Sequence, residues 1–229
     1  MLIIVTSVFS GFHLQLKKTF FQFSADVQIR QVEKDEWGQM IGVPIKNYEG
    51  LVGRMVKVPG VKGAMPIIVG KVMLETQPKD AEPAFDAPKL IGVDGERMKQ
   101  VSKVPESIVA GEFDLSGNGL VVGYNYGRPD GMFRLNVGDR VLIYSPQSLK
   151  EMKDAQEEGE TLGVLPDEYT VKGVFDAGQG ELNDFMFCDL YNAQDLYHIE
   201  DDQVHMVWVE TAQPLNLTPV KDGLQKELG

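Results

Sequence analysis

The chain contains a single cysteine and three histidines among its 229 residues. One thiol cannot form an internal disulfide, so a disulfide-stapled fold is excluded. Cys188 ends the apolar run 185–188, and we expect it to be a buried, unreactive side chain. His13, His198 and His205 have no partners at metal-ligand spacing, since the sequence has neither H-E-x-x-H nor C-x-x-C. All three histidines are therefore predicted to be structural.

Motifs for catalysis are also missing. The sequence has no G-x-S-x-G elbow, and the serine near Lys150 is not in an S-x-x-K arrangement. The glycines of segment 115–127 lack the G-K-[ST] ending of a phosphate-binding loop, so we interpret them as turns. The acidic run 200–202 lacks the ligand spacing of a calcium loop and is predicted to be a solvated turn. We therefore expect a protein that is not an enzyme and that uses no cofactor and no metal.

Positive charge is scarce. Lysine and arginine total 22 against 34 acidic residues, which gives a formal net charge of −12. A surface this acidic repels nucleic-acid backbones and offers no broad basic face to anionic headgroups. Nucleic acid is thus excluded as an expected partner.

No apolar run reaches the roughly 20 residues that a membrane-spanning helix requires. Residues 1–12 are nearly all apolar, yet no basic segment precedes them as in a signal peptide. They have the character of the last turns of a membrane span that begins before residue 1, and an ordinary buried helix is an equally good interpretation. Residues 13–21 are predicted to continue the same helix.

Periodicity predicts alternating strands and helices at both ends of the chain and short strands in the middle. Strands are expected at 24–32, 64–75, 90–93, 121–124, 137–144, 169–175, 183–190 and 203–211. Helices are expected after Asn47 as N-cap, near 193–197, and from Thr218-Pro219 with Val220, Leu224 and Leu228 inward. On strand 169–175, alternation places Tyr169, Val171 and Phe175 on one face. Residues between 32 and 47 are interpreted as a polar loop.

The resulting prediction is an α+β fold, in which a split α/β unit is interrupted by a β-rich insertion. Four segments follow: a membrane-proximal stalk helix at 1–23, the first part of the α/β unit at 24–89, the insertion at 90–182 and the second α/β part at 183–229.

The 24 residues between Tyr144 and Tyr169 form an unusually long connection, and such connections are often functional. The segment 147–158 is rich in helix formers, with lysine and acidic side chains four residues apart and Gly159 as a stop. An apolar stretch, 162–166, follows. The pattern predicts an arm at 145–168 with a helical stem and an apolar tip, and a solvated loop is the alternative.

Several segments together resemble the lipoprotein-releasing (Lol-type) permeases of ABC transporters. The stretch 3–29 resembles the end of a first membrane span and its stalk, and 58–74 resembles a helix-to-strand passage of that family. Segments 136–147 and 169–184 are similar to its "VGD.V.L..P" and "F.V.GIF..G..E.D" patterns. No single piece is specific, but the order is correct across nearly the whole chain.

This resemblance implies the periplasmic core shared with MacB-type permeases, a porter-like subdomain (24–89 and 183–229) holding an inserted sabre-like subdomain (90–182). It implies a bacterial inner-membrane protein that couples cytoplasmic ATP hydrolysis to lipoprotein release by mechanotransmission. Its partners would be a cytoplasmic ATPase subunit, a second permease copy or paralogue, lipoprotein cargo and a periplasmic lipoprotein carrier, with the membrane reached through missing helices.

The family's carrier-binding hook falls where the arm is predicted, although the acidic helical stem departs from the short hairpin of the family. The resemblance assigns carrier binding to the apolar tip, Leu162, Val164, Leu165 and Pro166. It assigns the membrane-proximal stalk to Phe9, Gly11, Phe12 and Phe20. Three alternatives stay open: a MacB-type efflux permease, an FtsX-type permease that regulates cell-wall hydrolases, and an unrelated soluble enzyme or ligand-binding domain.

Overall fold

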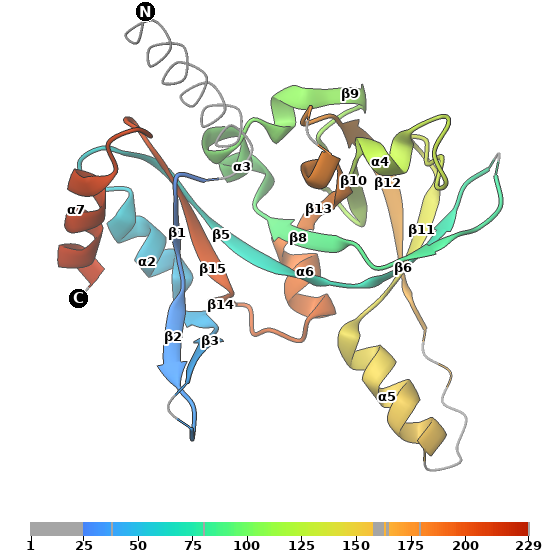
Figure 1. The fold of residues 1–229 in the computed structure, drawn as a ribbon, viewed down its shortest axis with the longest axis horizontal. Helices are drawn as coiled ribbons and strands as arrows, with labels where there is room; N and C mark the ends of the chain where they lie inside the picture. Colours follow the sequence, from blue (N-terminus) through green and yellow to red (C-terminus); the bar gives the residue numbers. More distant parts are fainter. Residues whose placement is uncertain are drawn as a thin grey trace, which may run out of the picture.

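The computed structural model describes residues 25–37, 39–79, 81–157, 163, 165–178 and 180–228. Most of its strands belong to one 11-stranded mixed sheet (Figure 1). Ten strands follow one another in the order β1 (Val27–Ile29), β15 (Met206–Thr211), β5 (Val61–Lys71), β8 (Lys89–Val93), β13 (Phe185–Asp189), β10 (Gly119–Gly123), β12 (Asp167–Phe175), β11 (Arg140–Tyr144), β6 (Met73–Gln77) and β7 (Phe85–Asp86). The eleventh, β9 (Ile108–Gly111), pairs with β12.

The sheet curls because of one connection. Val72 alone joins β5 to β6, yet six pairings separate these strands in the sheet, from β5 through β8, β13, β10, β12 and β11 to β6. The intervening strands must therefore turn back until β11 meets β6. The long ribbon of β5 and β6 crosses the whole width of the molecule and ties its two ends together (Figure 1).

Helices cover both faces of the sheet. One face and the inside of the curl form a core with α2 (Tyr48–Met55), α6 (Leu190–Leu196) and α7 (Thr218–Leu228). The opposite face forms a second core with α3 (Gly95–Val101) and the 3₁₀ turn η1 (Val104–Ser107). Strand β5 serves both cores, since Ile68 faces the first and Ile67 the second. This strand is therefore covered on both sides.

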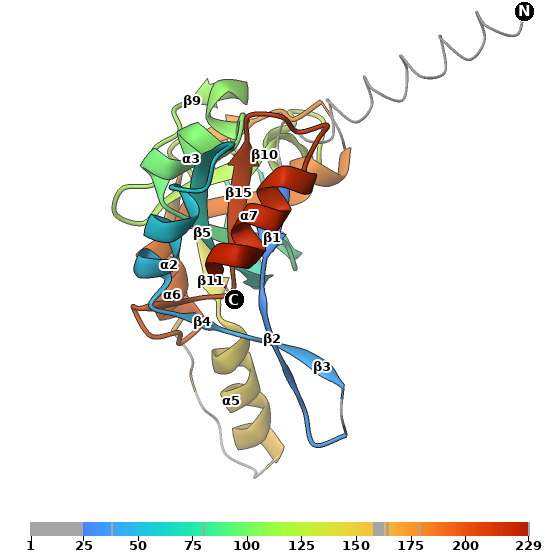
Figure 2. The same cartoon turned by 90° about the vertical axis from the view of Figure 1, so that its left-hand side faces the viewer.

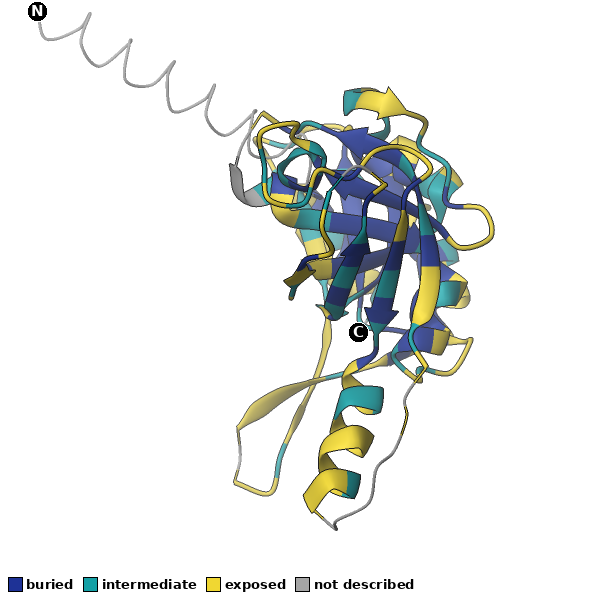
Figure 3. Ribbon diagram, turned by 90° about the vertical axis from the view of Figure 1, so that its right-hand side faces the viewer, coloured by how far each residue is buried: buried dark blue, intermediate teal, exposed yellow. Residues whose placement is uncertain are grey.

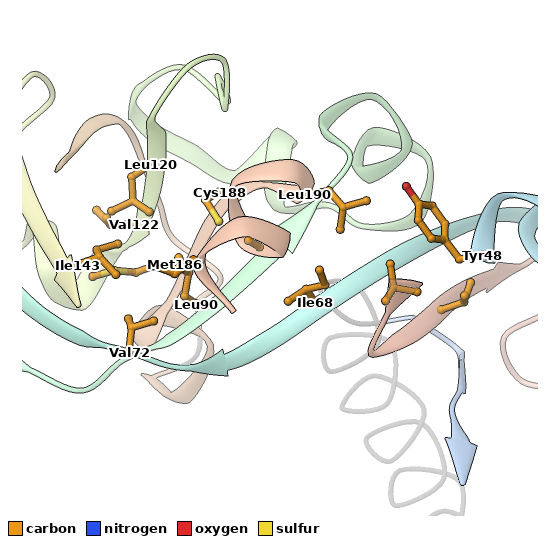
Figure 4. Packing of buried hydrophobic residues seen from close by; sticks show 14 of the residues in the cluster. Tyr48, Ile68, Val72, Leu90, Leu120, Val122, Ile143, Met186, Cys188 and Leu190 are labelled. Carbon is orange, nitrogen blue, oxygen red and sulfur yellow. The ribbon is translucent and has the colours of Figure 1, made fainter. Parts of the chain in front are cut away.

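Figure 4 shows the first core, in which Ile68, Leu90, Met186 and Cys188 lie together between strands and α6. Cys188 is fully buried, and burial raises the pKa of its thiol, as expected for a small apolar residue. The expected C-terminal helix is confirmed as well. Val220 and Leu224 are buried in it and Leu228 packs against the same core.

The segment expected to be a polar loop is instead largely extended. Strands β2 (Gln31–Lys34) and β3 (Met40–Val43) pair as a separate hairpin, and β4 (Ile45–Lys46) pairs with β14 (Gln203–Val204). The N-cap prediction is also wrong in its mechanism. Asn47 precedes α2, but it has a φ of 49° and its side chain makes no capping hydrogen bond.

The expected facing of strand β12 is wrong at Phe175. Tyr169 and Val171 face the first core, whereas Phe175 packs on Phe187 in the second, with ring centroids 5.5 Å apart. The ladder with β10 contains a bulge, because Leu120 pairs with Val171 and Val121 pairs with Gly173. One extra residue reverses the alternation of side chains, so later residues point to the other face.

The remaining helices are α4 (Tyr124–Gly127), α5 (Pro146–Glu157) and the 3₁₀ turn η2 (Gly180–Asp184). No helix in the described ranges is long and apolar enough to cross a membrane. Strand β8 crosses the expected boundary at residue 90, and one sheet joins the strands on its two sides. The division into 24–89, 90–182 and 183–229 stays a prediction, and the expected stalk helix at 1–23 lies outside the described residues.

Candidate partner-binding site

The arm projects from the neighbouring strands β11 and β12 of the sheet. Strand β11 leads into α5, and the chain returns through β12, with Ile143 and Asp167 paired at the base of the arm. Ser145 is buried there, and its Oγ accepts a hydrogen bond of 2.9 Å from the Ser148 backbone N–H. This is N-cap geometry, and Pro146 occupies the first helical position, where a missing N–H costs nothing. The sequence thus starts the helix directly at the edge of the core.

Helix α5 contains no buried residue. Its ribbon has only the colours of exposed and intermediate residues as it extends away from the sheet (Figure 3). Its surface pairs are local: Gln147 donates to Glu151 at 2.9 Å, and the Lys153 ammonium lies 3.6 Å from the Glu157 carboxylate. Such exposed pairs add little stability. The helical stem predicted from sequence is confirmed, and nothing in its packing explains why it is there.

The predicted tip is described only in part. Leu165 is 92% exposed, an extreme value for a leucine, and Pro166 is half-buried. Leu162 and Val164 lie outside the described residues, as do the four predicted stalk residues Phe9, Gly11, Phe12 and Phe20. The structure therefore places one strongly exposed apolar side chain in the expected tip.

A second projection was not predicted. The hairpin β2–β3 leaves the body on the same side as α5 and ends in a turn at Trp37, which is 82% exposed (Figures 2 and 3). Asp35 shapes this turn, because its Oδ1 accepts hydrogen bonds from the backbone N–H groups of Trp37 and Gln39. Met40 and Ile41 on β3 are also exposed. The signal in the sequence was the pair of short apolar-containing runs on either side of a turn that carries Asp35 and Glu36.

The predicted structural histidine His205 sits between β14 and β15, where its Nδ1 lies 3.1 Å from the Val69 backbone nitrogen and 3.0 Å from the Val69 carbonyl oxygen. Burial lowers the pKa of His205. His198 adopts a φ of 52° just after α6, and His13 lies outside the described residues. In the part of the chain that is described, no three His, Cys, Asp or Glu side chains are grouped to hold a metal.

A crevice lies where the parallel strands β8 and β13 end and α3 and α6 begin. Asp94 and Asp189 cap these two helices, each accepting hydrogen bonds from backbone N–H groups of the first turn. The crevice has a volume of about 610 Å³ and is rich in carboxylates. Arg97 neutralises one of them through two hydrogen bonds to Glu49, at 2.8 and 3.0 Å. These interactions are internal to the protein and explain much of the acidic lining.

No family model matches the sequence, and no curated protein sequence matches it. Solved structures that share its fold include two domains of transporters. The periplasmic region of MacB from Actinobacillus actinomycetemcomitans aligns with a TM-score of 0.52 and 10% identity, covering 81% of this chain and 74% of that one. The extracellular domain of the noncanonic ABC-type transporter YknZ from Gram-positive bacteria aligns with a TM-score of 0.50 and 13% identity, covering 79% and 78%.

At these identities the likeness concerns the fold. Both structures are mixed domains that lie outside the membrane in their own proteins. The α+β class and the MacB-like core expected from sequence are confirmed. The chain has the fold of the MacB periplasmic region.

Proposed function

We propose that this chain is the extracytoplasmic domain of an ABC-transporter permease in a bacterial inner membrane. Its role is mechanical and not catalytic: it transmits the movement driven by a cytoplasmic ATPase subunit. The observation that carries the proposal is the shared fold with two transporter domains, MacB and YknZ, over about four fifths of the chain. The sequence also supports it, because several segments resemble lipoprotein-releasing permeases and occur in the same order along the chain.

We further propose that the transported cargo is a lipoprotein, handed to a periplasmic carrier, and that the permease works with a second copy or a paralogue. The support is the arm. A 12-residue helix with no buried side chain contributes nothing to the core, and it is followed by Leu165, which is almost fully exposed. Exposed apolar side chains on projecting segments are typical of binding sites. We assign carrier binding to the arm tip, Leu162, Val164, Leu165 and Pro166.

An efflux permease is the second candidate, and one observation favours it: the structural neighbours described above include MacB itself. An FtsX-type role in cell-wall control would keep the same fold and change only the partner. The cargo and the arm's partner therefore decide among the candidates.

Topology and assembly can be tested in the native host. The variant Lys150→Cys places a thiol on exposed α5, and it should react in intact cells with a maleimide that crosses the outer membrane but not the inner one. The unchanged chain is the matched control, because its only thiol, Cys188, is buried. Affinity purification from detergent-solubilised membranes should recover an ABC-type ATPase. Labelling that requires permeabilised inner membranes, or purification without an ATPase, would overturn the proposal.

The lipoprotein assignment has a separate test. Depleting the protein should leave lipoproteins in the inner membrane, and Leu165→Asp should reduce recovery of a periplasmic carrier in crosslinking experiments. Leu215→Asp is a suitable control, since Leu215 is 55% exposed and lies outside the arm. Normal lipoprotein sorting after depletion would eliminate the cargo assignment and leave the permease proposal standing.

A further inference from the structure

One end of the second sheet face is not covered by α3, whose contacts concentrate on β5 and β15. A pocket of about 190 Å³ lies there. It is lined by side chains from β1, β15, β5, β8, β13, β12 and the two 3₁₀ turns, namely Gln28, Arg30, Val69, Lys89, Ile91, Val104, Phe175, Leu182, Phe185, Phe187, Met206 and Trp208.

The strand registers fix how the floor of the pocket is built. Gln28 pairs directly with Trp208 across β1 and β15, so both side chains point to the same face. In the neighbouring strands Ile91 pairs with both Val69 and Phe187. The bulge in β12 adds Phe175 to the wall, by turning it away from the first core. The result is a rigid apolar floor made by paired strands.

Trp208, one of the lining residues, carries an unsatisfied hydrogen-bond donor. Trp208 is 8% exposed, and its indole N–H is buried without an acceptor anywhere in the described part of the chain. Buried polar groups in folded proteins nearly always have a partner, since an unpaired donor loses its bonds to water and gains none. A ligand oxygen that reaches this N–H would supply the missing acceptor.

The charge of the lining is opposite to that of the whole protein. The chain carries 12 more negative than positive charges, yet the pocket is lined by two cations, Arg30 and Lys89, and by no acidic side chain. Both cations are exposed, and neither takes part in an ion pair between described residues. The Lys89 ammonium lies 5.4 Å from the centre of the Phe185 ring at the edge of the pocket. An anion bound there would therefore face positive charge and no negative side chain in the lining.

Size limits the apolar part of a ligand. An apolar cavity of about 150 Å³ accepts a benzene ring, so about 190 Å³ accommodates roughly six to eight carbon atoms on the same scale.

We propose that this pocket binds a small anionic amphiphile, a carboxylate carrying a medium-length aliphatic chain. The chain lies on Ile91, Phe187 and Met206, and the carboxylate lies toward Arg30 and Lys89, where one oxygen accepts the Trp208 N–H. Such binding goes beyond the permease role and does not depend on it.

Octanoate is a suitable probe, since its seven chain carbons match the pocket volume, and the variant Trp37→Phe makes Trp208 the only tryptophan. Titrating the full chain with octanoate below its micelle concentration should change the Trp208 emission in a saturable way, with a matching binding heat by calorimetry. Octanol, which lacks the charge, should bind at least tenfold more weakly, and octyltrimethylammonium should bind more weakly still.

Variants assign the binding to the pocket. The pair R30Q and K89Q should reduce octanoate affinity to that of octanol, whereas K57Q and K62Q, with the same charge change at exposed lysines elsewhere, should not. Leu182→Trp should fill the pocket and abolish the calorimetric signal. The proposal is overturned if the full chain shows no saturable binding, including the case in which another segment, a second copy or a partner covers the pocket. It is equally overturned if the cationic amphiphile binds as well as octanoate or if R30Q and K89Q have no effect.

Discussion

The carboxylate of Asp26 accepts two hydrogen bonds from Thr211, one from the backbone N–H at 2.9 Å and one from the side-chain hydroxyl at 2.7 Å. The two residues are 185 positions apart in the sequence. Asp26 directly precedes β1, and Thr211 ends β15, the strand with which β1 pairs. These bonds therefore fasten the first described segment to the edge of the sheet.

We expect Thr211→Val to lower the free energy of unfolding by about 1–2 kcal/mol. Thr211 is fully buried, so valine keeps its shape and removes only the hydroxyl donor to a charged acceptor. Urea unfolding followed by circular dichroism measures the difference. Thr170→Val in β12 is the matched control, because Thr170 is half-buried and lacks a carboxylate acceptor among the described residues. Equal effects of the two substitutions would show that the bond to Asp26 adds no stability.

Glu210 lies beside Asp26 and should make the stability of the protein depend on pH. Burial, and then the negative charge of Asp26, raise the pKa of Glu210 from 4.5 to about 7. Between these two pH values the folded state holds a proton that the unfolded state has released. The stabilising contribution is therefore fully present below pH 4.5. The contribution is lost as the pH rises from about 4.5 through about 7.

The variant Glu210→Gln resembles the protonated form at every pH. It should unfold at higher urea than the unchanged chain at pH 8, by about 1 kcal/mol because solvent screens a half-buried carboxyl. Near pH 4 the two should be equal. Glu106→Gln is the control. Glu106 and Glu210 line one surface pocket, but Glu106 is exposed, so its substitution should show no such pH-dependent gain. A constant difference from pH 4 to pH 8 would contradict the assignment.

Much of the fold could be predicted because its strands carry strong local patterns. The run 64–75 is apolar at consecutive positions, and it became β5 and β6, with β5 covered on both faces. The helical stem of the arm was readable for the same reason, since segment 147–158 is rich in helix formers. The order of strands in the sheet could not be predicted, because pairings such as β6 with β11 depend on contacts between residues far apart in the sequence.

The misses have particular physical causes. Phe175 faces the second core because a bulge in a distant ladder shifts the alternation, and nothing in the segment 169–175 itself encodes that partner. The pocket at Trp208 was also invisible. Its lining comes from six strands and two 3₁₀ turns, and each apolar residue in it looks like ordinary core in its own segment. The exposure of Leu165 was predictable because the predicted tip is one continuous segment of sequence.

Packing between β8 and α6 gives a last prediction. A Cβ atom added to Gly92 would lie 2.1 Å from the Cβ of Ala193, much closer than carbon atoms can approach. Gly92→Ala should therefore push α6 from the sheet and lower the free energy of unfolding by about 1–3 kcal/mol. Gly53→Ala is the control: no atom lies within 4 Å of the added carbon, and alanine in helix α2 should raise stability by about 0.5–1 kcal/mol.

The cause can be separated from a general intolerance of Gly92 by a second substitution. Ala193→Gly removes the opposing methyl group, so the double variant should recover part of the stability that Gly92→Ala loses, although glycine in a helix has its own cost. Unfolding free energies of the four proteins give the coupling between the two positions. Simple additivity would mean that the methyl groups do not meet, and that the close approach of α6 to β8 is not what requires glycine at position 92.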